Sequence, residues 1–563
     1  MNADSSTEDT DAVSDQPVDP SRRRLLRTIT AAGAAMVVGG TPLFSRATGL
    51  AVGPSDSMID GRLRKRIQHI VVIYCENRSF NNLFANFPGL QHPLAAVPPE
   101  RFRQCDRDGS ILSHLPPIWN GLVPHEQILD GHAYQIGENA IVDLANAPWK
   151  LRTASDQPLP HGLVTRDLIH DFYRNQMQIN NGRNDGFVAW GNSGALVMGQ
   201  YATSAANLHL WRLARSSTLC DNFFMGAFGG SFLAHQYLVA ARPPFYPDAD
   251  TSPAKIAIAV LDDRPTGYRL KLADASPGSA MKGNPRFITP YGQVTPDFYA
   301  VGTFSPPYPP AYNIHSKNKL REILAKDFTL PPQSHLTIGD VLSAKGVSWA
   351  WYGGAWQMAL DGKGQTGLSA SFPVVPDFQP HHQPFNYFRQ FAPGSEARAQ
   401  HLLDGGVGNE PATNRFIADI EAGQLPAVSF YKPQGNFTMH AGYTNIAAGD
   451  VHVARVIDAL MASSLWESTV VVITVDENGG WWDHVAPPKA DRWGPGNRIP
   501  ALVMSPYAKK DYVDHTVYDT GSIQRLINRR FGLDPLPGIK LRDASMRKYN
   551  GFAPGDLTAA LEL

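Results

Sequence analysis

The chain of 563 residues is nearly neutral, with 50 lysine and arginine residues against 51 aspartate and glutamate residues. This balance excludes the basic stripe that nucleic-acid-binding proteins carry, so we expect no nucleic-acid partner. Aromatic residues make up 10% of the chain, which also has 49 glycines and 45 prolines, a composition that predicts long ordered loops rather than disorder.

The amino terminus has the pattern of an export signal. Residues 1–20 are polar and acidic, and twin arginines at Arg22 and Arg23 precede an apolar run rich in alanine and glycine at 28–44. This order is typical of a Tat signal, whereas the alternative is a basic patch before a short helix. The apolar run is marginal for a membrane span, which needs roughly 20 residues, and no other stretch qualifies. We therefore expect a periplasmic or secreted protein without a transmembrane anchor after signal removal.

The three cysteines, Cys75, Cys105 and Cys220, are too few for a disulfide framework. A single bridge between Cys105 and Cys220 is allowed in an oxidising compartment. Cys75 lies in an apolar run and is expected to be a small buried side chain.

The first buried-strand pattern covers residues 67–74 and leads to Glu76 and Asn77. An apolar, β-branched run without alternation is typical of a strand that is buried on both faces of a helix-covered parallel sheet. Ligands bind at the carboxyl ends of such strands. The acid and the amide are therefore expected at a ligand-binding edge.

Long loops and one helix are expected next. Residues 88–160 are rich in proline, glycine and polar residues, which predicts loops and short helices over this edge. The following segment looks helical up to about Ile179, with His170, Arg174 and Met177 on one stripe. His170 could therefore face inward, although a lone histidine there is more often structural.

Ser231 follows two glycines at the start of an apolar, helix-like run. As an N-cap it would contribute ~1 kcal/mol. As a nucleophile it would lie at the positive end of a helix, where free N–H groups stabilise an oxyanion or a phosphate. The segment has no Gly-x-Ser-x-Gly elbow, so an α/β-hydrolase is not indicated. The local pattern alone favours the cap.

The next region contains two histidine sites. Residues 241–335 are rich in proline, tyrosine and aspartate and are expected to form an insertion or a small subdomain, followed by a helix and a strand up to Tyr352. His381 and His382 lie in a loop before a proline, either as functional residues or as a solvent-exposed pair. A strand at 425–431 precedes a loop that carries His440.

The last acidic pair follows the strongest strand pattern. An amphipathic helix is expected over Asp450–Ala462, with Val451 facing inward, and it leads to the β-branched run 470–475 and then to Asp476 and Glu477. Two carboxylates at the end of a central strand cost several kcal/mol of desolvation unless a cation or a hydrogen-bond network holds them. The alternative is a solvated acidic turn. Together with the acid and the amide of the first strand, they predict a shared cation site in an α/β sheet.

These motifs resemble the bacterial phosphoesterase family that contains acid phosphatase A and the phosphatidylcholine-type phospholipases C. The resemblance implies an alkaline-phosphatase-like α/β core, a central mostly parallel sheet flanked by helices, with long insertions or a small subdomain. With the sequence patterns described above, it gives a disordered leader and Tat signal over 1–50 and a single catalytic domain over 51–563, with insertions roughly at 88–160 and 241–335. The matching motifs, in family order, are HIVVIYCENRSFNNLF (69–84), DNFFMGAFGGSFLAHQYLVA (221–240), HHQPFNYF (381–388), YKPQGNFTMHAGY (431–443), DENGGWWDHV (476–485) and HTVYDTGSIQRLI (515–527).

The resemblance assigns roles to individual positions of this chain. It implies one divalent metal ion of unknown identity, and Ser231 as the nucleophile that also contacts this metal. The remaining implied metal ligands are Glu76, Asn77, Asp476 and Glu477. The implied phosphate-site histidines are His170, His381, His382 and His440. Asp483, His484 and His515 occupy family motifs with weaker support, as outer or structural residues.

The implied activity is that of an exported, metal-dependent acid phosphatase that hydrolyses phosphomonoesters through a phosphoserine. A phospholipase C acting on phosphatidylcholine-type lipids is the runner-up, and a non-catalytic phosphate- or metal-binding protein is the alternative from another class. Phospholipase C members commonly have Thr-x-Pro-Asn-Arg where this chain has residues 231–235, which favours the acid phosphatase branch. Histidines that gain charge below pH ~6.5 fit an acid optimum, and His170, His381 and His440 are all candidates for the general acid.

Overall fold

The computed structural model describes residues 56–264, 267–290, 292–310, 329–363 and 376–563. These residues belong to one compact unit, Ser55–Leu563. The expected leader and Tat signal over 1–50 lie outside the described residues. Among the helices that are described, none is long and apolar enough to cross a bilayer.

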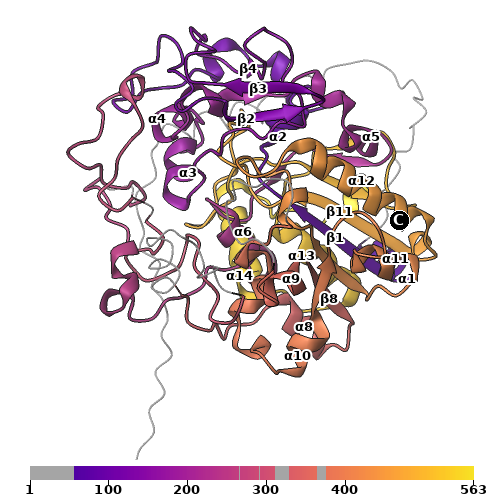
Figure 1. Ribbon diagram of the computed structural model, residues 1–563. Coiled ribbons are helices and arrows are strands. Elements are labelled where there is room, and N and C mark those ends of the chain that lie inside the picture. Colours follow the sequence, from indigo (N-terminus) through magenta and orange to yellow (C-terminus); the bar gives the residue numbers. More distant parts are fainter. Residues whose placement is uncertain (1–55, 265–266, 291, 311–328, 364–375) are drawn as a thin grey trace, which may run out of the picture. The chain divides into compact units, whose positions relative to one another are not determined.

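A sheet lies at the centre of this unit (Figure 1). It has eight strands in the order β13-β6-β12-β11-β1-β10-β8-β9. The five strands from β11 to β9 are parallel, whereas β12 runs antiparallel to both of its neighbours. The α/β class and the mostly parallel sheet are therefore confirmed. The strands are β1 (His69–Cys75), β6 (Thr218–Cys220), β8 (Trp349–Gly354), β9 (Leu402–Gly406), β10 (Val428–Lys432), β11 (Thr469–Val475), β12 (Ala501–Met504) and β13 (Tyr512–Asp514).

The two central strands end at the same level. β1 and β11 pair without an offset from His69↔Thr469 to Cys75↔Val475. Nearly every residue of both strands is buried, because the β-branched side chains pack on both faces of the sheet. The residues that follow the two strands, Glu76 and Asp476, consequently leave the sheet side by side.

Helices cover both faces of the sheet. α12 contacts α5 and α11, whereas α13 contacts α1 and α6, and Figure 1 shows α12 and α5 above β11 and α13 below β1. The two faces are thereby shielded from water, as the all-apolar strands require. The helices named here are α1 (Asp56–Arg66), α5 (His209–Arg215), α6 (Ser231–Ala240), α11 (Arg415–Glu421), α12 (Ile446–Ala462) and α13 (Gly521–Phe531).

The region of residues 88–160 contains a feature that its composition did not predict. The strands β2 (Val123–Leu129) and β3 (His132–Ile136) form an antiparallel hairpin in this region. By contrast, the described part of 241–335 contains short 3-10 helices and isolated bridges, as its proline content suggests. The boundaries of both insertions stay a prediction.

The structure corrects the prediction for α12. This helix begins at Ile446 rather than at Asp450, because the Asn445 side chain accepts a hydrogen bond from the backbone N–H of Ala448 and caps it. Val451, which was expected to face inward, is 48% exposed. Asp450 is buried instead, and its carboxylate accepts hydrogen bonds from two backbone N–H groups at the start of α5.

All three cysteines are free. Cys75 is buried within β1, as predicted. The bridge that the sequence allowed between Cys105 and Cys220 is not formed.

Candidate active site

Four of the predicted residues meet where α6 begins above the ends of β1 and β11. We call Asn77, Ser231, Asp476 and Glu477 the serine half of the site. The Ser231 hydroxyl oxygen lies 3.3 Å from Asn77 Oδ1 and 3.5 Å from Glu477 Oε1. The backbone N–H of Asn77 donates to Asp476 Oδ1 over 3.4 Å, which ties the two strand ends together.

Ser231 does not cap α6. Gly230 occupies the N-cap position with an extended backbone, and the Ser231 hydroxyl makes no capping hydrogen bond. The cap interpretation is therefore wrong, and the hydroxyl faces the carboxylates instead. A Cβ atom at Gly230 would lie 2.8 Å from the carbonyl oxygen of His170, so only glycine allows this close approach of the two segments.

The two carboxylates after β11 are fully buried, so the solvated-turn alternative is wrong. No ion pair joins Asp476 or Glu477 to a lysine or an arginine in the part of the chain that the structure describes. Burial disfavours the charged forms, which raises the pKa of Asp476 to about 7 and that of Glu477 to about 8. These two groups would gain most from a bound cation.

The turn after Glu477 folds back over β1. Gly479 has a φ of +60°, and a Cβ atom there would lie 2.5 Å from the backbone oxygen of Asn77. Its N–H donates to Glu477 Oε2 over 2.6 Å. The glycine thus lets the backbone hold the carboxylate in place at close range.

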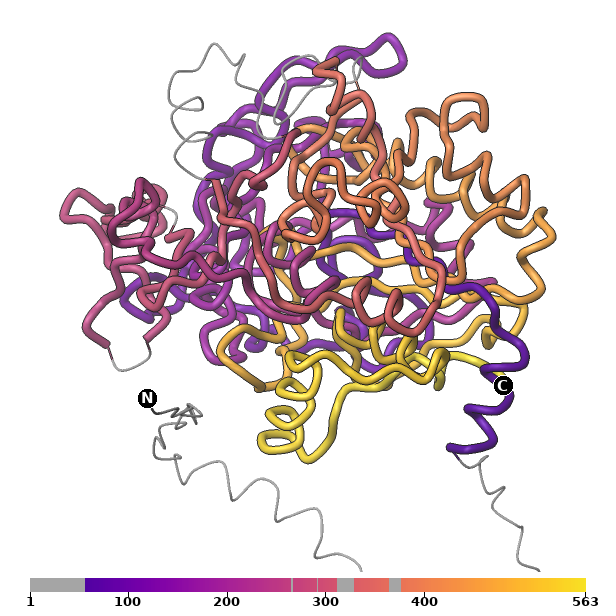
Figure 2. The backbone as a smooth tube through the Cα atoms, turned by 90° about the horizontal axis from the view of Figure 1, so that it is seen from below, coloured from indigo at the N-terminus to yellow at the C-terminus, as the bar shows by residue number. Residues whose placement is uncertain are grey.

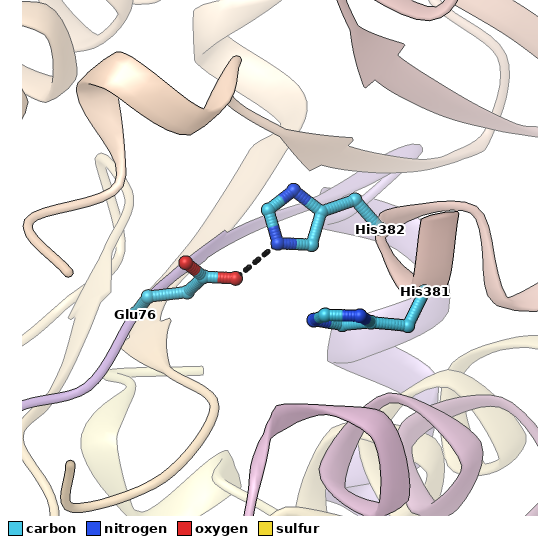
Figure 3. Close-up of side chains that lie close together, drawn as sticks. All are labelled: Glu76, His381 and His382. Carbon is cyan, nitrogen blue, oxygen red and sulfur yellow. Dashed lines mark ion pairs between the residues drawn. The ribbon is translucent and has the colours of Figure 1, made fainter. Parts of the chain in front are cut away.

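Glu76 lies in a different environment from its neighbour Asn77. Its Oε1 forms an ion pair with Lys432 Nζ at 2.8 Å and also contacts His382 Nε2, and its Oε2 accepts a hydrogen bond from the Tyr443 hydroxyl at 2.5 Å. Figure 3 shows this carboxylate pointing at His382, with the His381 ring alongside. We call Glu76, His381, His382, Lys432 and Tyr443 the lysine half of the site.

The electrostatics of Glu76 differ accordingly. Burial alone would raise the pKa of its carboxyl group, but the His382 ring and the Lys432 ammonium hold this pKa well below its ordinary value. The two halves are nevertheless in contact. Ligand atoms of Glu76, His235 and Asp476 all lie within 4.8 Å of one another.

The histidine pair is buried, with exposed fractions of 8% for His381 and 1% for His382. The solvent-exposed alternative is therefore wrong. Burial lowers the pKa of His382 to about 4 and holds that of His381 well below its ordinary value, so both rings are neutral. The His382 ring stacks on His235, with centroids 5.5 Å apart.

His170 reaches the serine half from a loop, and not from a helix. Asp171 caps α3 (Phe172–Ile179), so the helix begins two residues later than the predicted stripe requires. His170 Nε2 lies 3.4 Å from Asn77 Nδ2 and 3.6 Å from Glu477 Oε1. Burial opposes the charge of this ring, but Glu477 and Asp167 outweigh it and raise the pKa of His170 to about 9.

His440 lies behind His170. The two rings meet edge to face with centroids 5.4 Å apart, and His440 also stacks on Tyr443 of the lysine half. Burial lowers the pKa of His440. All nine predicted site residues are thus brought together.

A family profile described as "Phosphoesterase family" matches residues 67–534. The chain belongs to the Phosphoesterase family. It is similar to phospholipase C B of Mycobacterium tuberculosis, with 24% identity over 586 aligned residues that cover 97% of this chain and 86% of the relative. It is also similar to the non-hemolytic phospholipase C of Pseudomonas aeruginosa, with 28% identity over 174 residues, 25% of this chain and 24% of the relative.

Solved structures similar to this phosphoesterase include a protein in the alkaline phosphatase superfamily from Vibrio parahaemolyticus. The identity is 12%, the match covers 60% of this chain and 63% of that protein, and the TM-score is 0.29. A similarity of this size supports no argument, so the description of the fold rests on the strand order given above. Family membership itself identifies the chain as a phosphoric ester hydrolase.

The residues of this phosphoesterase fit a divalent cation. The serine half supplies carboxylate, amide and hydroxyl oxygens, which hard cations prefer, and Asp476 Oδ2 has no hydrogen-bond partner among the described residues. Three groups of acidic and histidine side chains have ligand atoms close enough to hold an ion. They are Glu76–His381–His382, Glu76–His235–Asp476 and Asp167–His170–His440.

The weaker candidates bind partners outside both halves. Asp483 is buried against Arg498, with 3.1 Å between Oδ1 and Nε. His484 contacts Asn81, and His515, with a side chain that is 45% exposed, contacts Asp221. Among the described residues, none of these three side chains forms a hydrogen bond or an ion pair with a residue of either half, and their role stays a prediction.

Sequence reasoning missed Lys432, Tyr443, His235 and Asp167. Lys432 and Tyr443 stand in the quoted motif 431–443, and a lysine that ends an apolar strand is a signal of a buried ion pair. His235 lies one helical turn after Ser231, and its Nδ1 is 3.6 Å from Asp476 Oδ2. Asp167 lies three residues before His170, with 3.8 Å between Oδ1 and Nδ1, and this local i,i+3 spacing was the available signal.

Proposed function

We propose that the chain is a metal-dependent acid phosphatase that hydrolyses phosphomonoesters through a phosphoserine at Ser231. The observation that carries the proposal is the position of this hydroxyl. It begins α6, makes no cap, and lies between the oxygens of Asn77 and Glu477. A serine at the positive end of a helix, surrounded by oxygen ligands for a cation, is placed for attack on phosphorus.

The serine half would hold the divalent ion, and Glu76 would support it from the lysine half. When bound, this ion would lower the pKa of the Ser231 hydroxyl and offset the negative charge of the phosphate. The Asp476 carboxylate accepts hydrogen bonds from the backbone N–H groups of Asn77 and Glu477, and the Glu477 carboxylate accepts one from that of Gly479. The arrangement is preorganised, so little energy is needed to orient the ligands.

In the first step Ser231 Oγ, after losing its proton to solvent, attacks the phosphorus atom. The bond from phosphorus to the alcohol oxygen breaks, and the alcohol leaves with a proton from His170 Nε2. We assign this proton to His170 because it is the histidine whose ring nitrogen reaches both Asn77 and Glu477. Water then returns a proton to His170 while its oxygen attacks phosphorus, and the bond to Ser231 Oγ breaks to release phosphate.

A phospholipase C is the second candidate, because the similar proteins of Mycobacterium tuberculosis and Pseudomonas aeruginosa carry that name. The segment 231–235, Ser-Phe-Leu-Ala-His, favours the phosphatase. Hydrolysis of p-nitrophenyl phosphate and of phosphatidylcholine vesicles should be compared with the same metal-loaded preparation. We expect the monoester to have the larger kcat/KM, whereas preferred release of diacylglycerol would establish the phospholipase. Inactivity on both would favour a binding protein.

We also propose that the protein is exported by the Tat pathway to the periplasm or beyond. Replacing Arg22 and Arg23 together by lysine should leave the protein in the cytoplasm, because the twin arginines are the signal that the pathway recognises. Cell fractionation followed by immunoblotting measures this. Unchanged export of the variant would contradict the proposal.

A further inference from the structure

Lys432 is the last residue of β10, and its ammonium lies inside the site with no exposure to solvent. Nζ pairs with Glu76 Oε1 at 2.8 Å, donates to the carbonyl oxygen of Cys75 over 3.5 Å, and lies 5.6 Å from the centre of the Tyr74 ring. Three kinds of partner therefore hold one buried positive charge. Lysine is almost never fully buried unless it is paired.

The position of this charge coincides with a group of potential metal ligands. Glu76, His381 and His382 have ligand atoms within 4.8 Å of one another. A carboxylate and two neutral imidazoles are a ligand set that Zn²⁺ accepts. The oxygen that Glu76 would offer to an ion here is Oε1, the same atom that Lys432 holds.

The charges of the paired and ligating groups balance with a single divalent ion. Glu76, Asp476 and Glu477 are fully buried carboxylates, and Lys432 is the one lysine or arginine that pairs with any of them among the described residues. Arg78, also buried, donates to the carbonyl oxygen of Met439 instead. Three negative charges, one ammonium and one divalent cation sum to zero, and the opposite charges of the neighbouring Asp167–His170 pair, with 3.8 Å between Oδ1 and Nδ1, cancel each other. A second divalent cation would leave two uncompensated positive charges in a buried site, which is costly.

We propose that Lys432 is a built-in cation that occupies the place of a second metal ion and restricts the site to one divalent ion. This inference rests on the proposed function, because it assumes that the serine half binds a metal. Lys432 is a positioning residue in this account. It fixes the Glu76 carboxylate and leaves Asp476 and Glu477 as the groups that need an external charge.

The test is the metal stoichiometry of the full chain. Three proteins are compared, namely the wild type and the variants Lys432→Met and Lys432→Arg. Each is stripped of metal with a chelator and saturated with Zn²⁺, and gel filtration then removes the excess ion. Elemental mass spectrometry measures the zinc that remains bound per chain. We expect one ion per chain in the wild type and in Lys432→Arg, and two in Lys432→Met, falling back to one when His381→Ala is added. Two ions in the wild type, or one in a folded Lys432→Met, would overturn the inference while the proposed function stands. No ion in the wild type would overturn both.

A double-mutant cycle covers the case in which Lys432→Met does not fold. Glu76→Gln alone removes one negative charge and should weaken Zn²⁺ binding at least about tenfold. Glu76→Gln with Lys432→Met restores the charge balance but not the Glu76 carboxylate, so it should bind Zn²⁺ at least about threefold more tightly than Glu76→Gln alone. A double variant that binds Zn²⁺ no better than Glu76→Gln would overturn the inference. Calorimetric titration measures both affinities without any activity assay.

Discussion

The serine half and the lysine half occupy neighbouring strand ends, yet they compensate their carboxylates differently. In the lysine half, Glu76 is bound by an ammonium and a phenol hydroxyl from the chain itself. In the serine half, Asp476 and Glu477 have backbone N–H groups, the Ser231 hydroxyl and, beside Glu477, the His170 ring, but no lysine or arginine among the described residues. An acid at a strand end therefore predicts a ligand-binding edge without predicting whether its charge needs an external partner.

Asp483 makes the same point from within the motif that contains Asp476. Both carboxylates are fully buried, but Asp483 has its own cation in Arg498. Only the carboxylate without an internal cation is in a position to need a metal. The predictions below exploit this contrast.

The largest expected effect follows the removal of the nucleophile. Ser231→Ala should lower kcat for p-nitrophenyl phosphate by more than about a thousandfold, because no other hydroxyl in the serine half can form the covalent bond. Steady-state kinetics measures the loss, and circular dichroism should show an intact fold. Ser193→Ala is the matched control, since Ser193 is a buried serine that contacts Asn192 and no residue of the site. Retention of more than a few per cent of activity in Ser231→Ala would exclude it as the nucleophile.

The two aspartates should respond to neutralisation in opposite ways. Asp476→Asn should weaken metal binding by roughly a hundredfold while the metal-free protein keeps or gains thermal stability, because an unpaired buried carboxyl is removed. Asp483→Asn should leave the metal affinity within about threefold of the wild type. It should lower the melting temperature, because the buried Arg498 loses its ion-pair partner. Calorimetric metal titration and thermal unfolding measure the two effects. Equal loss of metal affinity in both variants would remove the distinction between them.

The proton donor can be tested through the leaving group. His170→Gln should lower kcat by about a hundredfold for an alkyl phosphate, which needs a proton on the departing oxygen. The loss should be much smaller for p-nitrophenyl phosphate, because nitrophenolate leaves without one. His440→Gln is the matched comparison, since His440 stacks behind His170. Identical losses on both substrates would show that His170 only positions other groups.

The smallest effect expected is a dependence of metal stabilisation on pH. In the metal-free protein, the pKa values of Asp476 and Glu477 are raised to about 7 and about 8. The folded state therefore binds protons more tightly than the unfolded state, so this contribution to stability is complete below the ordinary carboxyl pKa and is lost as the pH rises through 7 and 8. At the higher pH, where Asp476 and Glu477 have lost their protons, a bound metal ion compensates their charges and restores this stability.

The rise in melting temperature on adding metal should therefore be a few degrees larger at pH 8 than at pH 5.5. Thermal unfolding of chelator-treated and metal-loaded protein at both pH values gives this difference. A metal effect that is larger at the acid pH would contradict the assignment of these carboxyl groups as metal ligands.

The sequence predicted the central strands well because each is a short run of consecutive apolar residues, which indicates burial without reference to the rest of the chain. The β-branched runs that became β1 and β11 pack on both faces, and no other arrangement hides them. The role of Ser231 came from the family resemblance and not from its surroundings, since the same local pattern also fits a cap. What excludes the cap is the extended backbone of Gly230, which is visible only in the folded chain.

The features that the sequence did not predict are either contacts between residues far apart in the chain or helix boundaries that a single residue determines. The Glu76–Lys432 pair joins residues 356 positions apart in neighbouring strands, which no local window can detect. The prediction that His170 lies on a helical stripe was wrong, because Asp171 caps α3 and leaves His170 outside the helix. Val451 was placed inward because it is apolar, but the buried stripe of α12 runs through Asp450, Val453 and Ile457 instead.

The most direct test of the central claim is to locate the phosphoryl group during turnover. The metal-loaded enzyme is mixed rapidly with p-nitrophenyl phosphate, denatured within the first turnovers in acid and, separately, at mildly alkaline pH, and mapped by peptide mass spectrometry. The two conditions are needed because phosphohistidine survives only the second. We predict phosphate on Ser231 and none in Ser231→Ala. Phosphate on His170, His381, His382 or His440, with Ser231 unmodified, would contradict the account.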